Sequence, residues 1–292
     1  MPADGPPLPC RTLVEVAEML RSRELTSVAL TQAVFAHIGH HEPSLHAFCC
    51  LMPDQALADA ATADAEIAAA GTTKGPMHGV PIAVKDLYAV AGVQNAAGSK
   101  ALLENLPVPT EDCTVVARFK AAGAVIVGKL NTTEGAMGGY NQYLEDAIPC
   151  NPWNVNHWAG ASSSGSGVAT AAGMGFTTLG SDTGGSIRFP AAACGTVGLK
   201  PTWGRVSRYG VLDLAQTLDH VGPLSRCTAD AAITLQIIAG PDPSDPTTLP
   251  VPTPALFSAG PDWQLLLDMP ADRKSPVRTN NAFCIKKQGT LQ

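Results

Sequence analysis

The chain has 292 residues, of which 45% are hydrophobic and 15% are charged, and its formal net charge is −6 at pH 7. This composition excludes disorder for most of the chain, and the length allows one large domain or two modest ones with a sizeable core. The negative charge and the lack of a long basic run argue against nucleic acid as a partner. No apolar run reaches the ~18 residues of a membrane span, and no signal-peptide pattern is present. Eight cysteines without C-x-x-C spacing indicate reduced, mostly buried thiols and a cytoplasmic location.

Helix signals dominate the N-terminal part of the chain. Thr12 and Glu15 have the Thr-x-x-Glu spacing of a capping box in front of an apolar run, which predicts a helix start. A second helix is expected to begin near Ser27. An Ala-rich third helix is expected to start at about Asp54 and to stop at Gly71.

Short apolar runs then alternate with helical segments. We predict buried strands over residues 80–84 and 124–127, and a further strand that ends at Asp182. Helices that alternate with continuous apolar strands indicate an α/β fold with a largely buried sheet.

A Pro-rich stretch, residues 240–254, closes this pattern. We therefore assign residues 1–250 to one domain. Residues 251–292 have weak periodicity and a basic, polar end, so we expect them to form a divergent, loosely packed tail.

Three motifs are weak candidates for function. Gly123–Lys129 has the Gly-x4-Gly-Lys spacing of a phosphate loop, but Leu130 replaces the expected Ser or Thr and the spacer is β-branched. The four histidines from His37 to His46 lack an HExxH motif or a cysteine partner, so a solvated helix end is a better interpretation than a metal site. Ser163 lies in a loose relative of the nucleophile elbow, but no strand signal precedes it.

Three other segments make chemical sense together. Lys85 follows the apolar run 79–84. A lone lysine at the end of a strand more commonly reaches solvent, but if it is held inside, desolvation would lower its pKa from roughly 10.4 and make a neutral amine available as a base. The Gly/Ser-rich run 158–173 is either a flexible linker or a close-packed backbone that presents serines. Within residues 180–192, two glycines precede Ser186 at the start of an expected helix. Successive N–H groups there can converge into an oxyanion hole, or the segment is an ordinary turn.

At these segments the sequence resembles the amidase signature family. The stretches GVPIAVKD, GASSSGSGVATAAG and LGSDTGGSIRFPAAACGTVGLKPTWGRVSRYGV are similar to its three hallmark segments and occur in the family's order. The similarity runs from about Val14 to Thr248. The resemblance implies an α/β fold with a large mixed β-sheet flanked by helices, and hydrolysis or transfer of amides by a Ser–cis-Ser–Lys triad.

Carried over residue by residue, the resemblance assigns catalytic roles to three side chains. Ser186 aligns with the nucleophile, Ser162 with the bridging serine and Lys85 with the catalytic lysine. The family also has a cis peptide bond before the bridging serine, which in this sequence joins Ala161 to Ser162 and has small neighbours that allow close packing. The Gly/Ser run is then not a linker.

The resemblance further implies a supporting loop around the nucleophile. Its oxyanion hole would use the backbone N–H groups of Thr183, Gly184, Gly185 and Ser186. Asp182 and Arg188 match positions that support this loop. No metal or organic cofactor is implied, the expected partner is a small-molecule amide, and a homodimer is left open.

The sequence also departs from the family pattern. Ala161 and Ser164 stand where the common family form has glycines. Family catalytic domains continue well beyond this length, so we expect a sheet that is incomplete at the C-terminal side and an activity that suffers from it.

Three functions are therefore weighed. The first is an amidase that hydrolyses the carbon–nitrogen bond of a small molecule. The second is a catalytically impaired amidase-like fragment or interaction module. The third is a glutamyl-tRNA amidotransferase A-type subunit that supplies ammonia.

Overall fold

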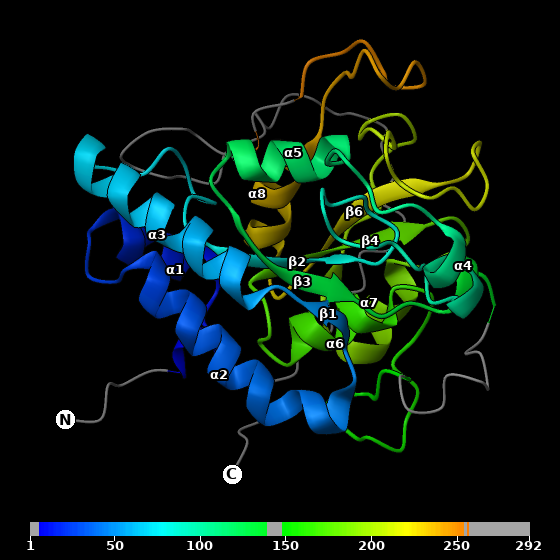
Figure 1. Ribbon diagram of the computed structural model, residues 1–292, viewed down its shortest axis with the longest axis horizontal. Coiled ribbons are helices and arrows are strands. Elements are labelled where there is room, and N and C mark those ends of the chain that lie inside the picture. The colour runs from blue at the N-terminus through cyan, green and yellow to red at the C-terminus, as the bar shows by residue number, and fades with distance from the viewer. Residues whose placement is uncertain (1–5, 139–147, 254–255, 257–292) are drawn as a thin grey trace, which may run out of the picture.

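A six-stranded mixed sheet forms the centre of the computed structural model, which describes residues 6–138, 148–253 and 256. The strands lie in the order β1-β3-β2-β4-β6-β5 (Figure 1). Strand β2 is parallel to both β3 and β4, whereas β1, β5 and β6 form antiparallel pairs. The predicted α/β fold with a mixed sheet is confirmed. The strands are Phe48–Leu51 (β1), Pro81–Lys85 (β2), Val125–Leu130 (β3), Thr177–Asp182 (β4), Val197–Gly198 (β5) and His220–Ser225 (β6).

Helices cover the sheet on both sides in the described part of the chain. Figure 1 shows α5 and α8 on one side of the strands and α6 and α7 on the other. The helices are Leu13–Arg21 (α1), Ser27–Leu45 (α2), Pro53–Ala70 (α3), Lys100–Asn105 (α4), Thr114–Ala121 (α5), Ser164–Ala171 (α6), Arg188–Cys194 (α7) and Thr228–Ile238 (α8). Two short 3-10 helices, Leu8–Cys10 (η1) and Glu134–Ala136 (η2), complete the regular structure.

The predicted helix boundaries near the N-terminus are confirmed. At the start of α1, the Thr12 side chain accepts a hydrogen bond from the N–H of Glu15, and the Glu15 carboxylate accepts one from the N–H of Thr12. Helix α2 begins at Ser27. Helix α3 stops before Gly71, whose φ of 72° is the left-handed conformation that glycine adopts without steric cost.

Strands β2, β3 and β4 are buried along their whole length. The apolar runs of β2 and β3 predict this burial, whereas β4 has the sequence TTLGSD and buries mainly small and polar residues. Lys85 is the last residue of β2 and Asp182 is the last residue of β4. Because β2 and β4 are parallel, their carboxyl ends meet at one edge of the sheet. Polar groups from two distant parts of the sequence are brought together there.

The segment with phosphate-loop spacing is a strand. Gly123 precedes β3, and Lys129 lies within it with no exposed surface. The Lys129 Nζ atom lies 2.6 Å from a carboxylate oxygen of Asp86 and donates to the carbonyl of Gln94. A buried lysine that is already paired cannot reach a phosphate, so the spacing is coincidental.

The prediction of mostly buried cysteines is wrong. Seven cysteines lie in the described residues and all are free, but only Cys113 and Cys194 are buried. Cys10 and Cys49 are exposed, and Cys50, Cys150 and Cys227 are half-buried. Cys49 and Cys50 lie in β1, Cys10 ends η1, and the other two lie outside the helices and strands.

The predicted tail, residues 251–292, lies almost entirely outside the described residues. Of this segment the structure describes 251–253 and Leu256. The backbone N–H of Leu256 donates to the side chain of Gln236 on α8. Across the described ranges, no helix is both long enough and apolar enough to cross a membrane.

Candidate active site

Lys85 is the centre of a buried cluster of hydroxyl groups. Its side chain has no exposed surface, and its Nζ atom lies 2.8 Å from Oγ of Ser162, 3.1 Å from Oγ of Ser163 and 2.8 Å from Oγ of Ser181. Within the described residues, no carboxylate forms an ion pair with this lysine. Its only hydrogen-bond partners there are neutral side chains that exchange protons readily.

Burial changes the acid–base chemistry of Lys85. Removal of the ammonium from water lowers the pKa of Lys85 to about 7, although the charges of Asp182 and Asp219 act in the opposite direction. A lysine with a pKa near neutrality can take up and return a proton at physiological pH. Of the two alternatives that the sequence leaves open for the lysine at the end of β2, the structure shows the buried one.

The Gly/Ser run is part of the packed interior. The peptide bond between Ala161 and Ser162 is cis, as the resemblance implies. The carbonyl oxygen of Ser162 accepts a hydrogen bond from Thr132 Oγ1 at 2.9 Å. A Cβ at Gly165 would lie 2.4 Å from the carbonyl oxygen of Ala47, so only glycine fits this close approach. The flexible-linker alternative is therefore excluded.

Ser186 lies in the loop between β4 and α7 and is partly exposed. The backbone N–H of Ser163 donates to the carbonyl of Ser186 at 3.2 Å. This bond ties the loop to the segment that carries Ser162.

Asp182 organises the loop around Ser186. Its carboxylate accepts hydrogen bonds from the N–H of Gly185 at 2.8 Å and of Ile187 at 3.2 Å. It also accepts two hydrogen bonds from the guanidinium of Arg188, at 2.9 and 3.0 Å. Burial by itself raises the pKa of Asp182, but the hydrogen bonds and charge of Arg188 and the two N–H groups outweigh it and lower the pKa. The charged form of this carboxylate is thus favoured, and it holds the turn closed.

The four N–H groups expected at the oxyanion hole have different surroundings. The N–H of Gly185 is occupied by Asp182. In the described residues, the N–H groups of Gly184 and Ser186 have no hydrogen-bond partner. The Thr183 side chain donates to the carboxylate of Asp219, which fixes the start of the loop.

Ser162 and Ser186 line one open cavity of about 340 Å³. The remaining lining residues of this cavity, which we call the serine cavity, are Ala136, Gly138, Trp158, Ala161 and Phe189. Lys85 is not among them, and it contacts Ser162 from the protein interior. A ligand in the cavity can therefore meet both serines, but it reaches the lysine only through them.

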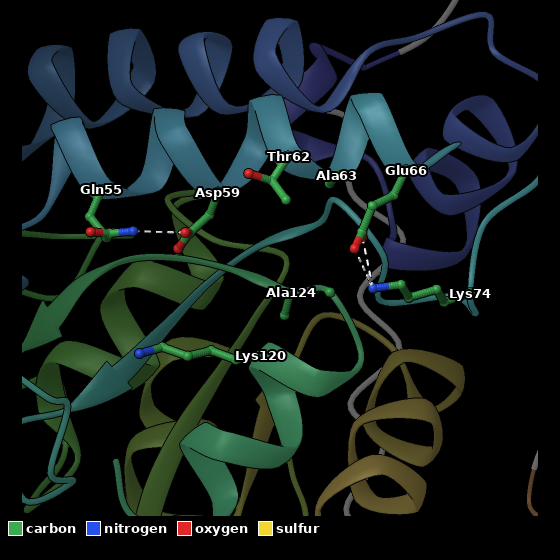
Figure 2. A pocket seen from close by; sticks show the side chains of 9 residues that line it. Gln55, Asp59, Thr62, Ala63, Glu66, Lys74, Lys120 and Ala124 are labelled. Carbon is green, nitrogen blue, oxygen red and sulfur yellow. Dashed lines mark hydrogen bonds and ion pairs between the residues drawn. The ribbon is translucent and has the colours of Figure 1, made fainter. Parts of the chain in front are cut away.

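A second cavity, of about 200 Å³, lies beside α3 and the start of β3. Figure 2 shows Gln55 beside Asp59, and the ion pair between Glu66 and Lys74, whose Nζ and carboxylate oxygen lie 2.7 Å apart. No residue predicted for catalysis lines this cavity. It is a charged surface hollow away from the buried lysine.

Two contacts of Lys85, Ser163 and Ser181, do not follow from the sequence motifs. The motif around Ser163 suggests a nucleophile, and no motif marks Ser181. The available signal was the adjacency of two parallel strands, since β4 pairs with β2 through Thr178 and Leu179. A strand residue one position before Asp182 must then lie near the end of β2, but this pairing cannot be read from local pattern.

The mixed sheet and the buried lysine–serine cluster define an α/β protein with a candidate hydrolytic site. The family model "Amidase" matches residues 29–263, and the chain belongs to this family. The sequence is 52% identical over 242 residues to AmiD of Mycobacterium tuberculosis, whose name assigns it as an amidase, covering 83% of this chain and 50% of AmiD.

Other relatives extend this comparison. The chain is 48% identical over 248 residues to the A-type subunit of the glutamyl-tRNA(Gln) amidotransferase of Geobacter sulfurreducens, covering 85% of this chain and 50% of that relative. The solved peptide amidase of Stenotrophomonas maltophilia matches with a TM-score of 0.77 and 38% identity, covering 83% of this chain and 50% of that chain. The chain thus spans about half the length of the curated relatives it matches.

Proposed function

We propose that this chain carries the catalytic groups of an amidase that hydrolyses the carbon–nitrogen bond of a small-molecule amide. One observation carries the proposal: Lys85, buried without a carboxylate partner in the described residues, lies 2.8 Å from Ser162, which shares an open cavity with Ser186. We infer that Lys85 is the base, Ser162 the relay and Ser186 the accessible hydroxyl. The membership in the amidase family supports the same reaction class.

In this proposal, the proton moves in two linked steps. Ser162 passes its hydroxyl proton to the neutral amine of Lys85 and takes the hydroxyl proton of Ser186. The Oγ atom of Ser186 then forms a bond to the amide carbon, and the carbonyl oxygen becomes an oxyanion. The proton returns from Lys85 through Ser162 to the nitrogen as the carbon–nitrogen bond breaks. Water hydrolyses the resulting ester to a carboxylic acid by the same relay.

We assign stabilisation of the oxyanion to the N–H groups of Gly184 and Ser186. Neither group has a hydrogen-bond partner in the described residues, whereas the N–H of Gly185 is bound to Asp182. Preorganised donors of this kind typically contribute about 10²–10³-fold in rate. Asp182 and Arg188 then act as positioning residues, because they hold the turn without lining the cavity.

A labelling experiment tests the proposal directly. The chain is treated with a fluorophosphonate, and the modified residue is located by mass spectrometry. We expect modification at Ser186 and its loss in Ser186→Ala, with circular dichroism unchanged because Ser186 is partly exposed. Ser44→Ala, an exposed serine of α2, is the matched control. Labelling that persists in a folded Ser186→Ala chain would remove Ser186 as the nucleophile.

A second candidate is an ammonia-supplying subunit of a tRNA-dependent amidotransferase. The 48% identity to the A-type amidotransferase subunit of Geobacter sulfurreducens favours it. Glutamine hydrolysis that depends on copurifying partner subunits would support this function over a stand-alone amidase. Absence of any labelling at Ser186 would instead favour an impaired fragment or an interaction module. For location we propose the cytoplasm, since the seven described cysteines are free thiols.

A further inference from the structure

The serine cavity has an aromatic wall. Trp158 and Phe189 both line it, with ring centroids 5.8 Å apart and ring planes inclined at 56°. The two side chains are 52% and 54% exposed. Large aromatic surfaces left open to water beside converging polar groups are typical of a binding site for an apolar group.

The backbones that carry this wall are held firmly. The side chain of Asn151, which is buried, donates to the carbonyl of Trp158 at 3.1 Å and to the carbonyl of Ala193 at 2.9 Å. The thiol of Cys194 donates to the carbonyl of Ala159. These bonds tie the segment before Ser162 to helix α7. The aromatic side chains are therefore presented by a fixed backbone, which reduces the entropy that a ligand must overcome.

Phe189 lies directly beside the nucleophile loop. Its N–H donates to the carbonyl of Gly185 at 2.7 Å. A Cβ on Gly185 would lie only 2.9 Å from a ring carbon of Phe189, so the ring packs against the bare glycine, one residue from Ser186. An acyl group bonded to Ser186 would meet this ring.

The described lining of the serine cavity has no charged side chain. Arg188, the neighbour of Phe189, has its guanidinium bound to the carboxylate of Asp182. A charged acyl group would lose water in this cavity without gaining an ion partner among the described lining residues, which is unfavourable.

We propose that Trp158 and Phe189 bind the acyl part of the substrate and select amides of neutral aryl or arylalkyl acids. This inference rests on the proposed amidase function. Because the two rings are only 5.8 Å apart, a third ring does not fit between them. The substrate ring packs against both in tilted or edge-to-face contact, the arrangement that aromatic pairs prefer.

The test measures binding and is independent of turnover. The Ser186→Ala chain is titrated with 3-phenylpropionamide and, separately, with glutamine, and the dissociation constants are measured by calorimetry and ligand-observed NMR. We expect the aryl amide to bind about ten-fold more tightly or better. Adding Trp158→Ala or Phe189→Ala lowers this preference about five-fold, the range expected for loss of one aromatic contact. Leu103→Ala, which removes a side chain of α4 that is 52% exposed and does not line the cavity, leaves the preference unchanged.

The outcomes separate this inference from the proposed function. Equal binding of glutamine, no binding of the aryl amide, or the same preference in the two aromatic variants overturns the inference. Phe189→Leu, which keeps most of the side-chain volume, and circular dichroism exclude unfolding as the cause of a loss. Labelling of Ser186 in the unsubstituted chain is measured in parallel. Aryl preference without labelling contradicts the proposed nucleophile only, whereas labelling without aryl preference contradicts this inference only.

Discussion

Two buried lysines lie at the ends of neighbouring parallel strands and have opposite surroundings. Lys85 ends β2 and Lys129 lies one residue before the end of β3. Both side chains have no exposed surface. Lys129 is paired with the carboxylate of Asp86 at 2.6 Å, whereas Lys85 contacts only serine hydroxyls in the described residues.

The partner of each lysine decides what the lysine can do. A carboxylate at ion-pair distance stabilises the ammonium, so Lys129 serves as a structural cation. Hydroxyl partners carry no charge and do not offset the loss of water, which is why the pKa of Lys85 falls to about 7. A buried lysine without a carboxylate partner can thus act as a base, whereas a buried lysine with such a partner forms a structural ion pair.

Loss of the Lys85 amine tests the catalytic half of this comparison. We expect Lys85→Ala to lower the rate of Ser186 labelling and of amide hydrolysis by about 10²–10⁴-fold, the usual contribution of a proton-transfer group. The variant should stay folded, because removal of a buried amine that has no carboxylate partner in the described residues also removes its desolvation cost. Pseudo-first-order labelling rates and circular dichroism measure both effects. An active Lys85→Ala chain would contradict the role of base.

Loss of the Lys129 amine tests the structural half. Lys129→Met leaves the buried carboxylate of Asp86 without its partner, so we expect the free energy of unfolding to fall by about 3–5 kcal/mol. Chemical denaturation measures this change. The double variant Lys129→Met/Asp86→Leu, in which both charges are absent, should recover much of the stability. Equal stability of Lys129→Met and the unsubstituted chain would mean that the ion pair is not structural.

The pH dependence sharpens the comparison, because it reports Lys85 specifically. Only the neutral amine accepts a proton, so the labelling rate should rise about ten-fold per pH unit at acidic pH and level off above a midpoint near 7. The Lys85→Ala chain should show a flat profile over this range. A flat profile in the unsubstituted chain would mean that Lys85 is not the base.

The same titration predicts how stability varies with pH. The folded-state pKa of Lys85 is lowered from 10.5 to about 7, so the unfolded chain binds more protons between these values. The free energy of unfolding should therefore gain a positive slope with pH in this window, and Lys85→Met should remove that slope. Denaturant titrations at several pH values compare the two chains. Identical slopes would show that Lys85 is already charged in the folded state at neutral pH.

The smallest effect is expected from a single hydroxyl contact of Lys85. Ser181→Ala removes one acceptor that stabilises the ammonium form, so the pKa of Lys85 should fall further and the midpoint of the rate profile should move to lower pH. The plateau rate should change only a few-fold, because Ser162 keeps its contact. Ser166→Ala, a buried serine of α6 that donates to the carbonyl of Leu179, should leave the midpoint unchanged. A shift of equal size in both variants would indicate a general structural effect.

Much of the fold is predictable from local pattern. The cap at Thr12, the stop at Gly71 and the buried strands β2 and β3 follow from short-range rules of capping, glycine geometry and apolar continuity. The place of Lys85 at the end of a buried strand also follows, since an apolar run leads directly into it, but the burial of its amine does not. The partial or full exposure of five of the seven described cysteines, two exposed and three half-buried, does not follow, because composition alone does not show which segments lie at the surface.

The candidate site is only partly predictable for a related reason. The hallmark segments around Lys85, Ser162 and Ser186 are recognisable in the sequence, and the structure brings all three segments to one edge of the sheet. The contact of Ser181 with Lys85 and the engagement of the Gly185 N–H by Asp182 are invisible in the sequence. They depend on hydrogen bonds within and between folded segments that no periodicity encodes.

The two lysines show which features the sequence determines and which depend on the tertiary structure. In the sequence, GVPIAVK and GAVIVGK are both apolar runs that end in a lysine, and by itself the sequence determined only that each lysine stands at or just beyond the end of a predicted strand. Only the tertiary structure decided that Asp86 faces Lys129 and that Ser162, Ser163 and Ser181 face Lys85. The local apolar pattern sets the burial of the strand that leads into each lysine. The burial and the pKa of the amine itself depend on the segments that pack over it and on the charged and hydrogen-bonding groups that they bring within about 3 Å.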